Sequence, residues 1–222
     1  MNVQLVLTGD GSHTLAVPSM DEHYHSIHGA VSESGHIFIN AGLKYALQDK
    51  KKIRILEIGF GTGLNALLTF VELSGEKIFC EYTGIELYPV PEEIYSKLNY
   101  PAVLDIPDKS FLALHRCDWN EKIRISDFFS IYKIQISARN MKINKSYYDL
   151  VYFDAFGPDK QPEMWTEEVF RKISDSLKMG GILTTYSTKG SVKRIVKASG
   201  FSIEKLPGPA GKREILRAVK FQ

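Results

Sequence analysis

Residues 57–65 carry a glycine at every second position of their centre and read Glu-Ile-Gly-Phe-Gly-Thr-Gly-Leu-Asn. An apolar run over 53–58 precedes the glycines and helix-forming residues over 65–73 follow, which predicts a turn between a strand and a helix. Such a turn lets the main chain approach a bound nucleotide closely. A dinucleotide fingerprint, Gly-x-Gly-x-x-Gly, would need its third glycine at position 64, which is Leu; the third glycine here is Gly63. A tight turn without a ligand is the alternative.

A second carboxylate is expected where the next strand ends, because the apolar run over 79–85 leads directly to Glu86. A carboxylate in this place can accept hydrogen bonds from both hydroxyls of a ribose. Glu57, two residues before the first glycine, is the other acidic member of the pattern. The pair indicates an adenosine site, which would suit S-adenosylmethionine (SAM) and NAD alike. For Glu86 the alternative is a solvated strand end.

A third carboxylate follows the apolar run over 148–153, at the start of Asp154-Ala-Phe-Gly-Pro158. In doubly wound sheets, ligands bind beyond the carboxyl ends of the strands near the point where the strand order reverses. Asp154 would there face the glycine turn, where it could hold an amine and accept its proton. Capping of the turn before Pro158 is the alternative. Phe156 and Trp165 could stack on a base or belong to the core.

The order of these segments predicts an α/β fold, because from residue 52 onward strands alternate with helices. Helices are expected over 65–73, 166–178 and 191–198. Seven strands are expected, over 53–58, 79–85, 129–136, 148–153, 182–186, 201–205 and 214–219. No helix separates the last two, so we expect a mostly parallel sheet with one antiparallel strand.

The chain is expected to divide into an N-terminal extension over 1–47 and a core domain over 48–222. In the extension, 2–7 and 13–17 flank a turn-rich stretch and predict a hairpin, and 36–47 predicts a helix. Residues 88–127 contain Pro89, Pro91, Pro101 and Pro107, which favours an irregular insertion.

Composition excludes several classes of protein. The 222 residues are 44% hydrophobic and 24% charged, which is typical of a globular domain rather than a disordered chain. No apolar run approaches the roughly 18 residues of a membrane span, and no signal peptide is visible, so we expect a cytoplasmic protein without a membrane partner. The two cysteines and six histidines lack ligand spacing, so no metal is expected.

Basic residues are the feature that would suit a nucleic acid, although the net charge is only +2. Lys189, Lys193 and Lys197 recur at helical spacing with Arg194 beside them, and Lys212-Arg213 follows a Gly-Pro-rich loop. These residues predict a patch that contacts phosphates without reading sequence. A solvated helix face is the alternative for the lysine series.

Four segments resemble the bacterial methyltransferases that form 5-methylaminomethyl-2-thiouridine in tRNA, which occur as the MnmC methyltransferase domain and as the stand-alone MnmD form. The most specific is 148–166, Tyr-Asp-Leu-Val-Tyr-Phe-Asp-Ala-Phe-Gly-Pro-Asp-Lys-Gln-Pro-Glu-Met-Trp-Thr. The others are 180–187, 208–214 and 22–30. The Glu-x-Gly-x-Gly-x-Gly turn is similar to the first motif of all class I SAM-dependent methyltransferases.

The resemblance implies a class I SAM-dependent methyltransferase fold and N-methylation of 5-aminomethyl(-2-thio)uridine at the wobble position, within the anticodon stem-loop. It implies Asp154 as the catalytic residue, tRNA contacts by Phe156, Trp165 and the basic residues above, and SAM as the methyl donor. The residues expected around SAM are Glu57, Gly59, Phe60, Gly61, Gly63, Asn65, Glu86, Leu87, Ser137, Asp154, Tyr24 and Ser26. Ser137 stands where the family pattern has an acidic residue that meets the adenine. Bifunctional relatives carry an FAD oxidase domain; we expect none here, no flavin, and a separate enzyme that makes the aminomethyl precursor.

Two other functions stay open at this point. One is a small-molecule N-methyltransferase or an aminopropyltransferase-like enzyme on the same fold, which would not need the basic residues. The other is a non-catalytic tRNA-binding module, which is supported only by the altered region around Ser137.

Overall fold

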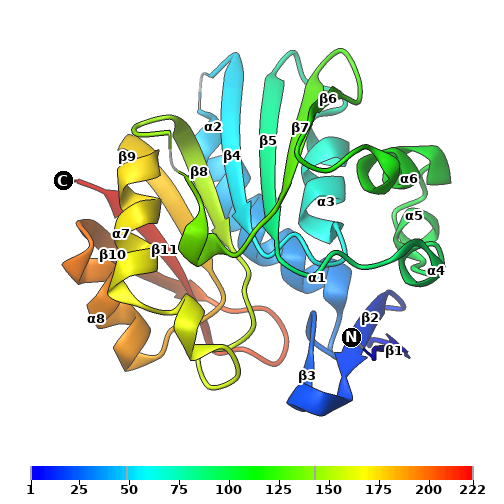
Figure 1. Cartoon of the computed structure of the whole chain (residues 1–222), viewed down its shortest axis with the longest axis horizontal. Coiled ribbons are helices and arrows are strands. Elements are labelled where there is room, and N and C mark those ends of the chain that lie inside the picture. The colour runs from blue at the N-terminus through cyan, green and yellow to red at the C-terminus, as the bar shows by residue number, and fades with distance from the viewer. Residues whose placement is uncertain (1, 49, 143, 222) are drawn as a thin grey trace.

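The computed structural model describes residues 2–48, 50–142 and 144–221. Its main sheet has eight strands in the order β10-β11-β9-β8-β4-β5-β7-β6 (Figure 1). The strands are β4 (Lys52–Ile58), β5 (Phe79–Glu86), β6 (Lys122–Arg124), β7 (Phe129–Gln135), β8 (Tyr148–Phe153), β9 (Leu177–Thr185), β10 (Phe201–Pro207) and β11 (Glu214–Lys220). All seven expected strands are therefore present, and the α/β fold class is confirmed.

The expected strand count is wrong by one. β6 is an additional edge strand that pairs antiparallel to β7, and β11 pairs antiparallel to both β9 and β10. The pairs β4–β5, β4–β8, β5–β7 and β8–β9 are parallel. Strand order reverses between β4 and β8, because the chain leaves β4 toward β5 and later returns to β4's other side. Ligand sites of doubly wound sheets form at such a point.

Both faces of the sheet are buried, and successive residues of the central strands point to opposite faces. Ile53 and Ile55 belong to one apolar cluster, whereas Leu56 and Ile58 belong to the other. This explains why β4 reads as a continuous apolar run.

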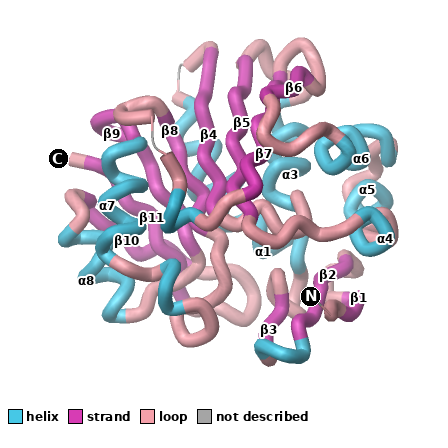
Figure 2. Tube along the Cα trace, viewed as in Figure 1, coloured by secondary structure: helices cyan, strands magenta, loops and turns pink. Residues whose placement is uncertain are grey.

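Helices cover both faces (Figures 1 and 2). On the face that carries Ile53 lie α3 (Leu64–Leu73) and a helical stretch made of α1 (Ala30–Ser34), the π-helix η2 (Gly35–Leu43) and α2 (Lys44–Leu47). α7 (Glu167–Ser176) and α8 (Gly190–Ala198) cover the other face. The helix expected over 36–47 thus begins earlier than predicted.

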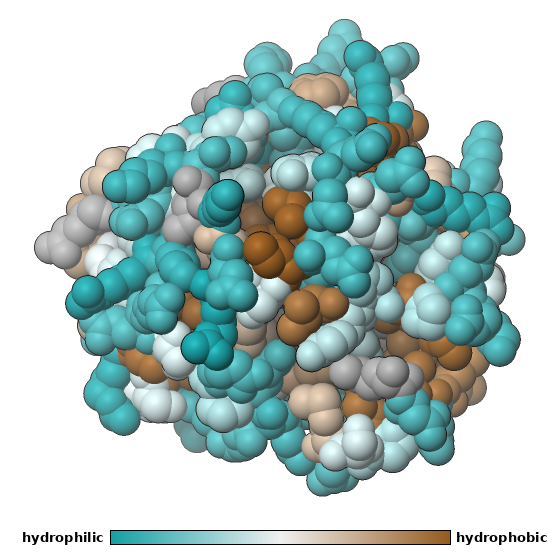
Figure 3. Space-filling view, viewed as in Figure 1, coloured by the Kyte–Doolittle hydropathy of each residue, from teal (hydrophilic) through white to brown (hydrophobic). Residues whose placement is uncertain are grey.

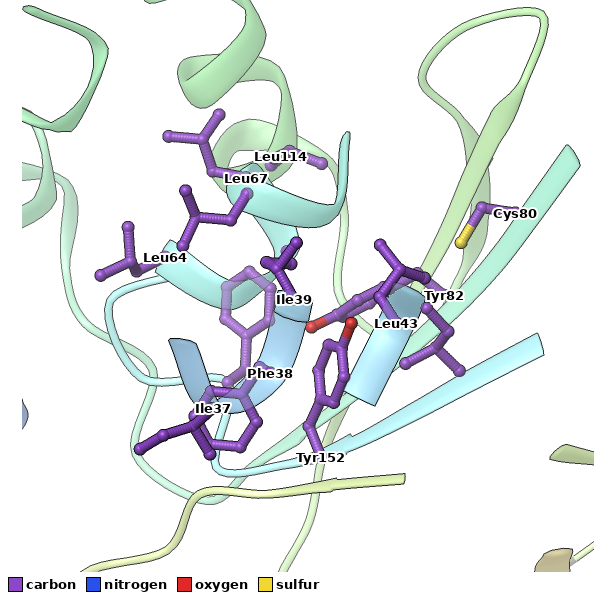
Figure 4. Packing of buried hydrophobic residues seen from close by; sticks show 14 of the residues in the cluster. Ile37, Phe38, Ile39, Leu43, Leu64, Leu67, Cys80, Tyr82, Leu114 and Tyr152 are labelled. Carbon is purple, nitrogen blue, oxygen red and sulfur yellow. The ribbon is translucent and has the colours of Figure 1, made fainter. Parts of the chain in front are cut away.

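The helical stretch of residues 30–47 is packed into the core. Its π-helical part contacts α3, β8, β9 and β11. Figure 4 shows Phe38 and Leu43 beside Tyr82 and Tyr152, whose hydroxyl ends turn into the same interior region. The tilted rings of Phe38 and Tyr152 lie 5.2 Å apart. The segment therefore contributes to the same apolar cluster as the sheet.

The segment 88–127 is more regular than expected. It contains α4 (Glu92–Tyr95), α5 (Tyr100–Val103), α6 (Asp108–Arg116) and β6. Pro91 and Pro107 stand at the N-caps of α4 and α6, and Pro101 lies in the first turn of α5. Proline has no N–H and a helical φ angle, so it suits the first turn of a helix. These prolines start helices rather than prevent them.

The N-terminal residues form a three-stranded sheet in the order β1-β2-β3. The expected hairpin is present, because β1 (Gln4–Leu7) pairs antiparallel with β2 (His13–Val17), and β2 pairs with β3 (Glu22–His23). Figure 1 places this sheet below the lower end of the main sheet, where the glycine turn begins. The division into units 1–47 and 48–222 stays a prediction. None of the described helices is long and apolar enough to span a membrane.

Candidate functional site

A cavity of about 690 Å³ lies at the carboxyl ends of β4, β5 and β8, where the strand order reverses. Most of its lining comes from five parts of the chain: the N-terminal residues 20–28, the turn 58–62, the residues 85–88 after β5, the residues 136–139 after β7, and the loop 154–164 after β8. Further side chains, among them Glu33, Asn65, Tyr186 and Lys212, complete it. Figure 3 shows the face seen in Figure 1 covered mostly by hydrophilic side chains, with hydrophobic ones near its middle and toward its lower right. The cavity lies in the size range of small-molecule sites, roughly 300–1,000 Å³.

The glycine turn is shaped by positive φ angles and close contacts. Gly59, Gly61 and Gly63 have φ angles of +88°, +48° and +71°. A Cβ on Gly59 would come within 2.6 Å of the Asp154 carbonyl oxygen, and one on Gly63 within 2.7 Å of His115 Nε2. A Cβ on Gly61 would meet the Tyr24 ring at 3.0 Å, on the cavity side. Glycine is required at these positions because of the backbone angle and the lack of space.

Glu86 holds this turn by its carboxylate. Gly61 N–H donates to Oε2 at 3.0 Å and Tyr88 N–H donates to Oε1 at 2.9 Å. Burial raises the pKa of Glu86, while these backbone hydrogen bonds lower it. Glu86 also lines the cavity, and its carboxylate has further lone pairs that can accept hydrogen bonds.

Asn65 joins the other two carboxylates. Its Nδ2 donates to Glu57 Oε1 at 2.9 Å and to Asp154 Oδ2 at 2.8 Å. Glu57 is fully buried and does not reach the cavity, and its Oε2 has no hydrogen-bond partner among the described residues. Burial holds the pKa of Glu57 well above its usual value, despite the bond from Asn65. Glu57 therefore contacts Asn65 and not the cavity itself.

Asp154 is half-buried and lines the cavity, and its own N–H donates to Ile58 O at 2.9 Å. This bond continues the pairing of β8 with β4 and fixes the direction of the side chain. Burial raises the pKa of Asp154 to about 7; the bond from Asn65 lowers it, Glu33 raises it and Lys212 lowers it. A carboxyl group with this pKa can accept a proton near neutral pH.

The N-terminal segment covers the cavity. The Tyr24 ring meets the Phe156 ring edge to face at 5.1 Å, which joins the segment to the loop after β8. Ser26 N–H donates to Glu33 Oε2 at 2.7 Å, and Glu33 Oε1 lies 2.5 Å from Lys212 Nζ. Lys212 comes from the hairpin between β10 and β11. Two loops from opposite ends of the chain thus meet over the cavity.

Several lining residues were not predicted as site residues, among them His25, Thr62 and Tyr186. His25 Nε2 lies 2.8 Å from Thr62 Oγ1, and burial lowers the pKa of His25 to about 4, so it is neutral at pH 7. The Tyr186 hydroxyl donates to Ala155 O at 2.9 Å, and Lys212 Nζ lies 5.2 Å from the Tyr186 ring centre. The sequence could have indicated both His25 and Tyr186. His25 stands between the predicted site residues Tyr24 and Ser26, and Tyr186 is the last residue of a predicted strand.

Two of the expected substrate contacts, Trp165 and Lys212, have partners within the protein. Trp165 is only 5% exposed and packs against Phe153 and Phe170, with its Nε1 donating to Phe156 O at 2.7 Å. It supports the loop from below and does not line the cavity. Lys212 is paired with buried Glu33 and belongs to the cover of the cavity, and its contact with tRNA stays a prediction.

The remaining predicted residues divide by position. Phe60, Leu87, Ser137 and Phe156 line the cavity with Tyr24 and Ser26. Ser137 Oγ accepts the Arg139 N–H at 3.4 Å and so starts the turn η3 (Ala138–Asn140). Outside the cavity lie Gly63, Glu57 and the basic residues Lys189, Lys193, Arg194, Lys197 and Arg213. No group of three His, Cys, Asp or Glu side chains that could hold a metal occurs in the described ranges.

Comparisons with known proteins agree with this geometry. Residues 106–221 match the family described as S-adenosyl-L-methionine-dependent methyltransferase. Relatives named tRNA 5-methylaminomethyl-2-thiouridine biosynthesis bifunctional protein MnmC are 28% identical over 225 residues in Cupriavidus metallidurans and 30% identical over 223 in Leptospira interrogans. Each match covers 95% of this chain, which spans 33% and 34% of those two proteins.

The similar solved structures include two that match nearly the whole of this chain. The crystal structure of MNMC2 from Aquifex aeolicus has a TM-score of 0.82 and 26% identity, and the match covers 100% of this chain and 70% of that one. Spermidine synthase from Thermotoga maritima has a TM-score of 0.61 at 14% identity, covering 98% and 69%. The second likeness concerns the fold alone.

Proposed function

The chain belongs to the S-adenosyl-L-methionine-dependent methyltransferase family, and from this premise we propose that it methylates the amino group of 5-aminomethyl(-2-thio)uridine at the tRNA wobble position. The names of the bifunctional MnmC relatives and the likeness to MNMC2 support this choice of acceptor. We place the reaction in the cytoplasm, with the aminomethyl precursor made by a separate enzyme.

The residues of the cavity fit SAM. A tight turn with glycine at its cavity side, Gly61, leaves room beside Tyr24 that a larger side chain would fill. Glu86 offers acceptors suited to ribose hydroxyls, and Leu87 with Ser137 lies beside it for the adenine. Asn65 Oδ1 has no hydrogen-bond partner among the described residues, which leaves an acceptor for an ammonium group. Tyr24 and Ser26 cover the same space from the N-terminal segment.

SAM, when bound, would supply an electrophilic methyl group for in-line displacement, in which the nitrogen–carbon bond forms as the carbon–sulfur bond breaks and a neutral thioether leaves. The chain's own contribution begins with Asp154, whose carboxylate orients the acceptor amine by a hydrogen bond. As the nitrogen–carbon bond forms, the nitrogen loses a proton, and an Asp154 Oδ accepts it directly or through water. Asn65 keeps the Asp154 carboxylate in place through the 2.8 Å bond to Oδ2. The cover formed by Tyr24 and Phe156 limits access of bulk water to the reacting groups.

One observation carries the proposal: Asp154 lines the cavity beside the glycine turn, and burial raises its pKa to about 7. An amine is largely protonated at pH 7, so an acceptor with a raised pKa favours the neutral nucleophile. A carboxylate in open solvent would be a much weaker base.

The test is transfer of a labelled methyl group from SAM to tRNA taken from a strain that lacks this modification step, with nucleosides resolved by mass spectrometry. We expect one added methyl on the aminomethyl(-thio)uridine of the wobble position. Asp154→Asn should lower the rate on the order of 100-fold or more. Asp175→Asn, an exposed carboxylate on α7 that lies outside the cavity, is the matched control. SAM binding without transfer to tRNA would contradict the proposal and point to a small-molecule acceptor.

A further inference from the structure

A second cavity of about 410 Å³ adjoins the first. The two share a wall made of Glu22, Gly157, Lys160, Tyr186 and Lys212. The loop after β8 therefore borders both cavities. A ligand that fills the first cavity and extends past Gly157 enters the second.

The far wall of the second cavity is basic and rich in hydroxyl groups. Lys189 and Arg213 line it, together with Ser187 and Thr188. The nine-residue helix α8 begins here, with Lys189 as its N-cap and no side chain capping its first N–H groups. Uncapped N–H groups at a helix start carry partial positive charge. Cations, hydroxyls and N–H donors on one wall are the set that binds a phosphate group.

The carboxylates near this wall leave it available to an anion. Lys189 pairs with Asp159, but both side chains are exposed, so the ion pair is weak and exchangeable. Glu214 pairs with Lys205 at 2.8 Å. In the described part of the chain Arg213 takes part in no ion pair. On the shared wall, Lys160 pairs with Asp21 and Lys212 pairs with Glu33, so among the described residues the charge of Glu22 is left over there. An anion is therefore better placed on the side of Lys189 and Arg213.

We propose that the second cavity holds a phosphodiester group directly adjoining the target uridine of the RNA, with Lys189 and Arg213 as its cations. The inference rests on the proposed function, which puts the modified base in the first cavity beside Asp154. The ribose of that nucleotide then passes the shared wall at Gly157, and the adjoining phosphate reaches the second cavity. Contacts of this kind position the RNA without reading its sequence.

The lysines of α8, which the sequence groups together by their helical spacing, do not all lie at the second cavity. Lys197 lies eight residues after Lys189 on α8, about 12 Å farther along the helix axis at 1.5 Å per residue. It therefore lies away from the second cavity, which begins at the start of the helix. Lys189 and Arg213, which come from different loops, share the site instead.

The test combines changes in the protein and in the RNA. Anticodon stem-loops are prepared with one neutral methylphosphonate linkage, placed either directly before or directly after the target uridine, and their binding is measured with wild type, Lys189→Gln and Arg213→Gln. Each change alone should weaken binding about tenfold, as expected for a lost charge-assisted contact. For one of the two linkages, the combined loss should stay near tenfold, because both changes remove the same contact. Lys109→Gln, which removes an exposed charge on α6, is the matched control. Its effect on binding should multiply with the effect of either neutral linkage.

Losses that multiply to about a hundredfold for both linkages would overturn the proposal. So would inorganic phosphate that binds wild type and not Arg213→Gln while RNA affinity is the same for both proteins, because the ligand would then be a free phosphate. Salt dependence gives a second readout: each variant should reduce the slope of log K against log salt by about 0.7–0.9. Methyl transfer to the same RNAs is measured in parallel. Coupling without transfer would refute the proposed function alone, and transfer without coupling would refute this subsite alone.

Discussion

Asp154 should lower the stability of the ligand-free protein at neutral and alkaline pH, so removing its charge should stabilise the fold while it destroys activity. Burial raises the pKa of Asp154 from its ordinary value of 3.8 to about 7. A raised pKa means that the folded state binds the proton more tightly than the unfolded chain does. The ionised form is therefore the unfavourable one in the folded protein.

The magnitude follows from the difference of about three pKa units. At 1.36 kcal/mol per unit, the penalty at pH 8 is at most about 4 kcal/mol. Because Asp154 is half-buried and reaches cavity water, we expect about half of that, roughly 2 kcal/mol. The penalty is fully present above pH 7 and decreases as the pH falls. By pH 5 it should be less than half its full size, and below 3.8 it is absent.

The assay is urea unfolding of the ligand-free protein at pH 5 and pH 8, with wild type and Asp154→Asn. The variant should be more stable at pH 8 by about 2 kcal/mol, with a smaller gain at pH 5, and an unchanged dependence on urea concentration. Asn can keep the contact with Asn65 by turning its amide oxygen toward Nδ2. Asp159→Asn on the same loop, whose side chain is exposed, should change stability by less than about 0.5 kcal/mol at either pH.

A particular result would refute this reasoning. If Asp154→Asn were less stable than wild type by the same amount at both pH values, the carboxylate would not be desolvated in the folded protein. The pKa of Asp154 would then have no physical reason to lie near neutral pH, and Asp154 would not be a base there. Loss of activity alone would not restore it.

Three further changes should have measurable effects. Lys212→Met should lower the free energy of unfolding by about 3 kcal/mol, because buried Glu33 loses its partner. Adding Glu33→Gln should restore part of the lost free energy. Equal stability of Lys212→Met and wild type would contradict the buried pair. Gly61→Ala should weaken SAM binding in calorimetry, because a Cβ meets the Tyr24 ring at 3.0 Å and φ is +48°; unchanged affinity would show that the turn does not bound the cavity. Glu81→Gln should lower the free energy of unfolding by about 2 kcal/mol at pH 7, because hydrogen bonds from Lys122, Tyr147 and Arg54 outweigh the effect of burial and lower the pKa of Glu81. The stability that ionised Glu81 contributes is present above pH 4.5 and is lost as the pH falls. Destabilisation by the variant that is equally large at pH 3 would contradict this cause.

The central strands and the glycine turn were predictable because local pattern and tertiary role agree there. β4 and β8 are buried on both faces, so their sequences are continuous apolar runs that end where the chain becomes polar. The parallel order then brings the ends of these runs to one edge of the sheet. Asp154 and the glycine turn could be placed together from this rule alone.

The cover of the cavity was less predictable, because its contacts join residues that are far apart in the sequence. Lys212 and Glu33 are 179 positions apart, and neither has a local pattern that indicates its partner. Lys212 follows a Gly-Pro-rich stretch, and a lysine in such a loop is usually exposed, so the sequence predicted a phosphate contact. Trp165 was equally ambiguous, since an aromatic residue in a loop can face a ligand or support the loop from the core.

The placement of both carboxylates around Asn65 suggests why the site is built at a cost in stability. Burial makes Glu57 and Asp154 bind protons more tightly, and one amide holds both in position through hydrogen bonds of 2.9 and 2.8 Å. Glu57 cannot reach the cavity, so its effect on chemistry passes through the orientation of Asn65. Glu57→Gln should therefore keep the fold but disturb the position of Asp154, since its amide can present N–H instead of an acceptor to Asn65. A shift in the pH profile of methyl transfer with unchanged SAM affinity is the expected signature, and an unchanged profile would assign Glu57 to packing alone.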